Sequence, residues 1–365
     1  MKLMKLDKDT VYAAAITCFF FSYLIHHPIL SMRLYSDIMT FWNRGFLQLL
    51  EPPYIKVGFE YPPLAGLITY ISALGREMTA YYTIFSLIIF VFYLALVEMV
   101  VKASSERGVG LEYALIFLAL SPSMILYSVY NFDVIFASLL FASIYAFTKK
   151  RLNLSAFLFS AAALAKLINL FILPFILMHI DGWRKRLRYS LISLGIFAAV
   201  NLALWAINPS FIEETYLYHA KWGLENAWFI ALFPDENTWN TAKIFSIFLM
   251  GYALLKVYLC DVEDVYMRVF MALTAYLLTT YVFTPQMALW ILPFLAVLGR
   301  IPIPYFFFEL SNSAIILTWF ETLTPTKFGS LPQSFAIIRA IFLFMILLDM
   351  YYSYKREHLE FIKKS

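Results

Sequence analysis

Asp37 is the first candidate for chemistry, because it lies in a short polar loop, residues 31–61, of an otherwise apolar chain. The same loop ends in Glu60 and Tyr61, which precede two prolines that predict a rigid turn. Carboxylates at the mouth of a membrane bundle are expensive to place, so they are functional candidates by default. Asp37 is predicted to be either the cap of a following helix or a general base that accepts a proton from a hydroxyl group.

Polar residues also interrupt the apolar segments farther along the chain. Asn131 and Asp133 precede a predicted span, where Asp133 is either a helix cap or a site residue. Lys166 stands alone between two apolar stretches, which costs a few kcal/mol unless it reaches water or binds a carboxylate or phosphate. Gln286 either joins two helices by hydrogen bonds or contributes a donor and an acceptor to the same site.

The longest segment expected on the outer side, residues 208–240, is predicted to form a lid at the membrane surface. It contains His219, Lys221, Trp222 and Glu225. Aromatic faces beside charged and hydroxyl groups suit the recognition of a sugar or glycan acceptor. An interfacial tryptophan belt accounts equally well for the tryptophans, but it does not account for His219 and Glu225.

The sequence has no motif for a soluble nucleotide or a metal. It contains neither a glycine-rich phosphate loop nor an HExxH zinc motif. Cys18 and Cys260 are too few and too far apart in sequence for a disulfide framework or a zinc site. The net charge of +4 is small and lies in loops, which argues against nucleic acid as a partner. An activated substrate is therefore expected to arrive through the lipid bilayer.

Membrane helices must position these residues. The chain has 365 residues, of which 62% are hydrophobic and 14% charged, and its mean hydropathy is +0.74. Soluble domains have roughly 25% charged residues. The composition therefore predicts an all-α polytopic membrane protein with a single domain over residues 1–365. Apolar runs of about 20 residues or fewer predict about 11–13 transmembrane helices.

An amphipathic helix is predicted directly after Asp37, lying at the membrane surface. Apolar residues recur at helical spacing over residues 38–49, and the opposite face carries Asn43, Arg44 and Gln48. The start of such a helix would fix a carboxylate beside the lipid headgroups, within reach of a sugar hydroxyl.

Basic clusters predict which end of each span faces the cytoplasm. They occur at residues 2–8, 102–107, 149–151, 184–188 and 355–364. All of them face the cytoplasm if residues 64–74 do not cross the membrane and if Lys166 lies in a turn between two short spans. This topology places the following residues on the outer face: Asp37, Glu60, Asn131, Asp133, Lys166, His219 and Gln286. In a prokaryote, the membrane would be the plasma membrane.

In this order the motifs resemble the GT-C superfamily of integral-membrane glycosyltransferases, which use polyprenyl-phosphate sugars. Residues 35–37, 60–64 and 131–133 are similar to motifs of polyprenol-phosphate-mannose-dependent α-mannosyltransferases. Residues 149–151, 215–219 and 284–290, with the segment around Lys166, resemble the catalytic subunit of GPI mannosyltransferase I. The resemblance extends from about Arg33 to Pro293.

The resemblance implies an inverting transfer of a hexose, in particular mannose, from a polyprenyl- or dolichyl-phosphate sugar to a lipid-linked or glycan acceptor. Asp37 would be the catalytic base, and Lys166 would bind the donor phosphate. The other residues on the donor side would be Glu60, Tyr61, Asn131, Asp133 and Gln286. The residues on the acceptor side would be His219, Lys221, Trp222 and Glu225.

The first loop departs from the GPI-type enzymes, which have Asp-x-Asp there. Met39 takes the place of the second carboxylate, and a thioether is a poor ligand for magnesium or manganese. No cofactor is therefore expected, and a divalent cation is not favoured. Two other functions stay open from the sequence: a lipid or glycan transporter or flippase, and a non-catalytic lipid-binding subunit. Transporters usually contain paired repeats, and we find none.

Overall fold

The computed structural model describes residues 6–30 and 34–364, with side chains as far as residue 357. The helices account for most of the described chain. Its β-type backbone pairing is limited to two isolated bridges, Pro53–Val57 and Glu225–Val282. The helices are α1 (Lys8–His26), α2 (Asp37–Asn43), α3 (Pro63–Ala73), α4 (Met78–Glu106), α5 (Leu111–Ala114), α6 (Pro122–Tyr127), α7 (Asp133–Thr148), α8 (Leu152–Ala165), α9 (Leu173–Leu177), α10 (Trp183–Ile207), α11 (Trp239–Leu259), α12 (Val265–Thr279), α13 (Leu292–Leu298), α14 (Pro304–Trp319) and α15 (Leu331–Lys364).

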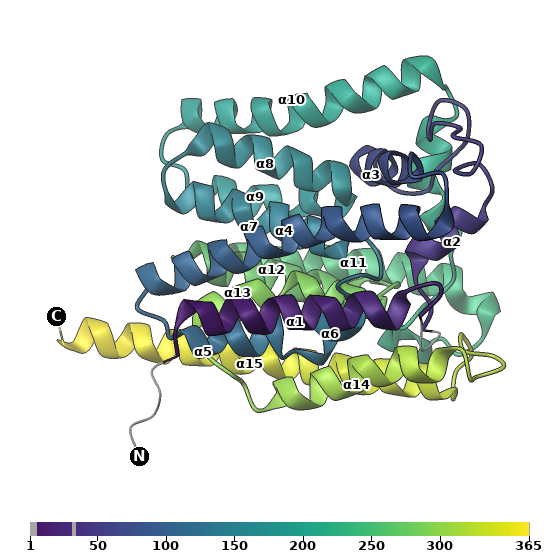
Figure 1. The fold of residues 1–365 in the computed structure, drawn as a ribbon. Helices are drawn as coiled ribbons and strands as arrows, with labels where there is room; N and C mark the ends of the chain where they lie inside the picture. The colour runs from purple at the N-terminus through teal and green to yellow at the C-terminus, as the bar shows by residue number, and fades with distance from the viewer. Residues whose placement is uncertain (1–5, 31–33, 365) are drawn as a thin grey trace.

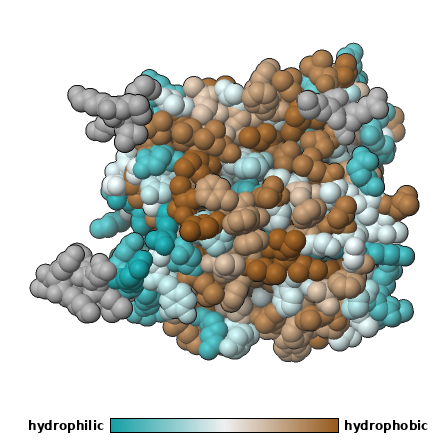
Figure 2. All heavy atoms as spheres, turned by 90° about the horizontal axis from the view of Figure 1, so that it is seen from below, coloured by the Kyte–Doolittle hydropathy of each residue, from teal (hydrophilic) through white to brown (hydrophobic). Residues whose placement is uncertain are grey.

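The long helices lie side by side along one direction (Figure 1). In the described residues, the helices long and apolar enough to cross a membrane are α1, α4, α10, α15 and the segment Glu236–Leu259, which contains α11. The shorter helices α7 and α12 are buried along most of their length. Figure 2 shows a broad apolar surface between more hydrophilic ends. The protein is therefore an integral, multi-pass membrane protein, as predicted.

The basic clusters of the described residues lie together at one end of the bundle, where α1 begins and α15 ends (Figure 1). Ion pairs join the loops there: Lys149 with Glu106, Arg107 with Asp264 (2.6 Å) and Lys355 with Asp261 (2.9 Å). We call this the basic end. Lys2 and Lys5, which belong to the first predicted cluster, lie outside the described residues.

Helix α3 does not cross the bundle, as predicted for residues 64–74. Both of its flanks contact the region opposite the basic end. Tyr61 packs against Phe132 just before α7, with ring centroids 4.7 Å apart, and Tyr81 in the first turn of α4 packs against Trp42 of α2 at 5.1 Å. Helix α4 therefore starts at the end where α3 lies and runs to the basic end.

The surface helix after Asp37 is shorter than predicted. Helix α2 ends at Asn43, because Gly45 adopts a φ of +85°, a conformation that glycine tolerates and that interrupts a helix. Ile38 and Phe41 are buried as expected, whereas Leu49 is 74% exposed. The apolar segment at residues 111–127 is likewise not one regular helix: it consists of α5, a π-helical turn at Leu115–Ala119 and α6.

Candidate active site

A polar cavity of about 310 Å³ lies at the end of the bundle opposite the basic end. Its walls come from the start of α2, the end of α8, the 208–240 segment, the turn before α13 and the end of α14. The structure brings most of the predicted residues to its lining: Asp37, Tyr61, Lys166, His219, Trp222, Glu225 and Gln286. Asn131 and Asp133 lie directly behind, in contact with lining residues.

Asp37 lines the cavity and does not cap its helix. The N-cap is Ser36, whose Oγ accepts a hydrogen bond from the backbone N–H of Ile38 (3.3 Å). Asn131 Nδ2 donates to Asp37 Oδ2 (2.7 Å) and so orients the carboxylate. Burial raises the pKa of Asp37 to about 6. A carboxylate that is ionised at neutral pH and still basic enough to take a proton is suited to general-base catalysis.

Lys166 ends α8 in extended backbone and is paired with a buried carboxylate. Its Nζ lies 2.9 Å from Asp133 Oδ1, which also accepts a hydrogen bond from Trp290 Nε1 (2.7 Å). The aromatic rings of Phe132 and Trp290 lie 5.5 and 5.3 Å from the ammonium group. Asp133 caps no helix; it instead supplies the partner that an intramembrane lysine needs.

An apolar groove of about 730 Å³ adjoins the polar cavity. The two share a border, which is formed by Tyr61, Lys166, His219, Trp222, Val282 and Met287. Beyond this border the groove is lined mostly by apolar residues of the 3₁₀-helical turn Leu167–Ile172 and of α11 and α12, such as Phe171, Ile247 and Leu254. A charged group at Lys166 would thus face polar residues on one side and hydrocarbon on the other.

Glu60 lines the groove but is not a free carboxylate. Arg44 donates to both of its oxygens, at 2.5 Å each, in a bidentate ion pair. The loop after α2 brings these two residues together, although they lie 16 positions apart in the sequence. Glu60 therefore fixes the loop that carries Asp37 in place, a contact that the sequence alone did not predict.

The 208–240 segment roofs the cavity with part of the predicted acceptor set. The ring of His219 packs against Tyr61 and Trp222, with centroids 5.2 and 4.6 Å away, and burial lowers the pKa of His219 to about 4. Glu225 exchanges backbone hydrogen bonds with residues 281 and 283, and burial raises the pKa of its carboxyl to about 7. At neutral pH, this places a neutral imidazole and a half-protonated carboxyl in the roof.

Lys221 does not join the site. Its Nζ lies 3.3 Å from Glu213 in an ion pair whose side chains are mostly exposed, and it lines neither the cavity nor the groove. Among the residues that the structure describes, no group of three or more His, Cys, Asp and Glu side chains is placed to hold a metal ion.

Residues 59–298 match the family described as glycosyltransferase family 87, and this segment is longer than half of the chain. The chain belongs to this family. The matched segment begins after Asp37, so it includes Lys166 and Gln286 but not Asp37. No curated protein matches the sequence.

The fold of this glycosyltransferase is similar to that of ArnT from Cupriavidus metallidurans. The apo crystal structure of ArnT has a TM-score of 0.51 and 13% identity, over 92% of this chain and 74% of ArnT. The structure bound to undecaprenyl phosphate has a TM-score of 0.51 and 14% identity, over 92% and 75% of the two chains. The predicted GT-C-like helical bundle is thereby confirmed.

Sequence reasoning missed a buried cation that holds the roof of the glycosyltransferase. Arg339 of α15 is fully buried and donates to Asn312 Oδ1 (2.7 Å) and to the backbone carbonyls of Asn226 (2.6 Å) and Phe283 (2.5 Å). The signal was present, because a lone arginine in an apolar run is costly unless it is bound. The arginine was not singled out, because residues 335–352 otherwise have the apolar composition of an ordinary membrane span.

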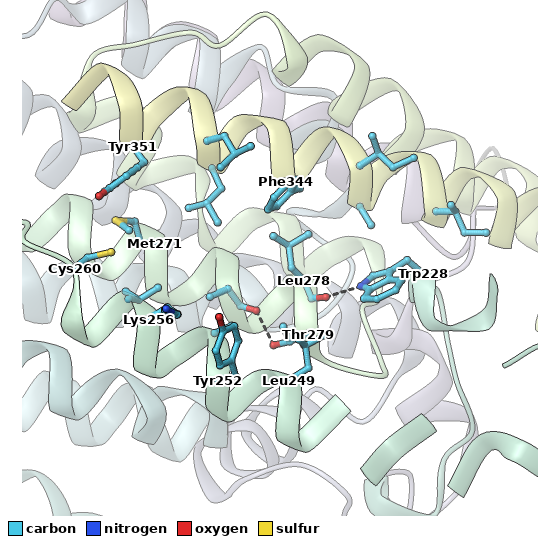
Figure 3. A pocket seen from close by; sticks show the side chains of 18 of the residues that line it. Trp228, Leu249, Tyr252, Lys256, Cys260, Met271, Leu278, Thr279, Phe344 and Tyr351 are labelled. Atoms are coloured by element: carbon cyan, nitrogen blue, oxygen red, sulfur yellow. Dashed lines mark hydrogen bonds between the residues drawn. The ribbon is translucent and has the colours of Figure 1, made fainter. Parts of the chain in front are cut away.

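A larger apolar cavity, of about 580 Å³, lies between α11, α12 and α15 (Figure 3). Its lining is apolar, as at Met271, Leu278 and Phe344, apart from a few polar groups and the single cation Lys256. None of the predicted site residues borders it. The glycosyltransferase therefore has its convergent polar groups in the smaller cavity, and we place the candidate active site there.

Proposed function

We propose that this glycosyltransferase moves a hexose, specifically mannose, from a polyprenyl- or dolichyl-phosphate sugar to a lipid-linked or glycan acceptor. The observation that carries the proposal is the shared border of the polar cavity and the apolar groove at Lys166. A donor with a sugar, a phosphate and a long hydrocarbon chain needs these three environments in this order. The crystal structure of ArnT with undecaprenyl phosphate supports a carrier lipid of this class.

The donor would lie with its phosphate at Lys166, its chain in the groove and its hexose in the polar cavity. Lys166 would keep Asp133 as a buried partner while it stabilises the phosphate charge that develops on departure. Tyr61 and Gln286 border the space for the sugar. Gln286 Oε1 is buried and has no hydrogen-bond partner in the structure, so a sugar hydroxyl there would satisfy it.

Asp37 would act as the general base. An acceptor hydroxyl gives its proton to the carboxylate while its oxygen forms a bond to the anomeric carbon. The bond from that carbon to the phosphate oxygen breaks on the opposite face, which inverts the configuration and leaves the polyprenyl phosphate. Asn131 would hold Asp37 in the orientation for this transfer. Holding the two reactants in place contributes at least as much to the rate as proton transfer does.

The acceptor would enter beneath the roof, against His219, Trp222 and Glu225. The roof lies at the end opposite the basic end, and basic residues gather on the cytoplasmic side of membrane proteins. The site is therefore proposed to face the outer side of the membrane.

The direct test is an assay of the purified protein in detergent, with dolichyl-phosphate-mannose and a panel of lipid and glycan acceptors. A mannosylated product that carries the inverted anomer is expected. The proposal fails if no acceptor is modified and no polyprenyl-phosphate hexose is consumed, although the protein is folded.

Transfer is expected to decline as the pH falls through about 6, because the pKa of Asp37 is raised to about 6 and only the ionised carboxylate takes a proton. Above that value the base is ionised; below it kcat/KM should fall about tenfold per pH unit. Glu225, whose pKa is raised to about 7, titrates nearby. The Glu225→Gln variant should keep the same acid limb. A rate that stays constant well below pH 6 would remove Asp37 from the role of base.

Transfer is expected to persist in excess EDTA. Met39 follows Asp37 where a second carboxylate would complete a cation site, and Glu60, the nearest substitute, is held by Arg44. Lys166 can meet the phosphate charge in place of a cation. Loss of product in EDTA, with recovery in Mn²⁺ or Mg²⁺, would overturn this expectation.

A further inference from the structure

A second polar cavity, of about 490 Å³, lies at the basic end and is formed by the first turns of α8 and α10. Its cationic lining residues are Lys150, Arg151, Lys185 and Arg188, and no acidic residue lines it. We call this space the basic cavity. We propose that the basic cavity binds the phosphate headgroup of an anionic membrane phospholipid.

The cations of the basic cavity have no carboxylate partner. Ion pairs elsewhere at this end engage neighbouring basic residues, as Lys149 does with Glu106. Among the described residues, none of the four cations of the basic cavity takes part in an ion pair. Lys185 and Arg188 are three positions apart on one helix, where like charges repel. An anionic ligand would relieve this repulsion.

The N-terminus of α8 borders this cavity through Arg151 and Leu152, and α10 contributes Lys185 and Arg188 from its first two turns. The N-cap positions of α8 and α10 are Arg151 and Gly182, and neither makes a side-chain capping hydrogen bond. The first N–H groups of a helix lack partners within it, and the positive end of the helix dipole favours an anion there. Basic side chains are the wrong sign for these positions. The helix end and the cations thus favour the same kind of ligand.

An apolar surface continues from the basic cavity along α10. The adjoining hollow, of about 480 Å³, has Trp183, Leu187 and Leu191 among its apolar lining residues. Two cations also line it, Arg184 and Arg188, and Arg188 borders both spaces. These three apolar side chains are 68%, 49% and 64% exposed. A phospholipid would place its headgroup in the first space and an acyl chain in the second, whereas a soluble phosphate would occupy only the first.

Membrane topology accounts for part of this arrangement. The tendency of basic residues to face the cytoplasm explains why they gather at this end. It does not require a hollow without carboxylates, a helix N-terminus without a side-chain cap and an adjoining apolar surface at one place. A basic pocket between transmembrane helices is a common form of headgroup site.

The test compares Lys185→Gln/Arg188→Gln with a matched control, Lys355→Gln/Arg356→Gln, which removes the same charge at the same end outside the cavity. The full-length proteins in detergent are titrated with phosphatidylglycerol or phosphatidylcholine, and bound lipid is counted by native mass spectrometry. Two basic residues at about 1 kcal/mol each predict a roughly thirty-fold loss of phosphatidylglycerol affinity in the first variant. The control should bind as the wild type does.

Equal retention of phosphatidylglycerol by the cavity variant and the control would overturn the proposal. So would equal binding of phosphatidylcholine, or complete displacement of the lipid by inorganic phosphate, because a soluble anion would then be the ligand. Melting without added lipid checks that the variants are folded. If the first variant is not, Lys150→Gln/Arg151→Gln gives the same comparison. The result does not depend on the proposed transfer reaction.

Discussion

The Asp37→Asn variant is expected to retain the fold and donor binding while transfer falls roughly 10²- to 10⁴-fold, the range that a general base contributes. The amide has nearly the same shape as the carboxylate, and Ser36 still caps α2, so the helix start should survive. The measurement is kcat for mannose transfer, with donor binding measured separately.

The matched control is Asp181→Asn, which removes an exposed carboxylate before α10, outside both the cavity and the groove. It should transfer at the wild-type rate. If Asp37→Asn turned over at a rate near the wild type, Asp37 would be a structural residue, and the half-protonated carboxyl of Glu225 would be the next candidate base.

Changing Lys166 is expected to have two effects, which the structure separates. Lys166→Ala removes the donor-phosphate partner and also leaves Asp133 buried without its cation, which costs roughly 3–5 kcal/mol of stability. The double variant Asp133→Asn/Lys166→Gln removes both charges, so it should fold more stably than Lys166→Ala. A charge-assisted hydrogen bond of about 1.5–3 kcal/mol predicts that donor affinity falls roughly ten- to hundred-fold in the double variant.

The Lys166→Arg variant should recover part of the donor affinity, because a guanidinium also binds phosphate and can keep a bond to Asp133. Thermal melting reports the first effect, and titration with dolichyl-phosphate-mannose reports the second. Wild-type donor affinity in the folded double variant would mean that the phosphate binds elsewhere.

Isolated polar residues in apolar surroundings were the predictable part of the site. Asp37, Lys166 and Gln286 stand out because burying them in a membrane bundle carries an energetic penalty that needs a reason. Composition predicted the fold class, and the distribution of basic residues predicted that α3 does not cross the bundle. The cost of burying isolated polar residues does not separate site residues from others within the 208–240 segment, because polar and apolar residues are mixed there. Lys221 was therefore included beside His219, although the structure turns it outward.

Partners distant in sequence were beyond prediction. The Arg44–Glu60 ion pair and the Lys166–Asp133 pair depend on how loops and helix ends meet in three dimensions, which one sequence does not specify. The length of α2 was misjudged because the apolar spacing continues past Gly45, whereas the backbone of that glycine ends the helix. Local pattern predicts which face is buried more reliably than it predicts where a helix stops.

Two parts of the roof of the cavity, one at Glu225 and one at His219, are held by different kinds of contact. Around Glu225 and Asn226 the roof is held by two backbone hydrogen bonds to residues 281 and 283 and by Arg339. Around His219 it is held by side chains: the Tyr281 hydroxyl donates to the carbonyl of His219 (3.4 Å), and Lys243 Nζ donates to the carbonyl of Ala220 (3.0 Å). We therefore expect the part of the roof at His219 to move more readily than the part at Glu225, which is held by backbone hydrogen bonds. His219 and Trp222 border both the cavity and the apolar groove beside Lys166, so under the proposed function a spent carrier lipid would leave past them while the wall at Glu225 stays in place.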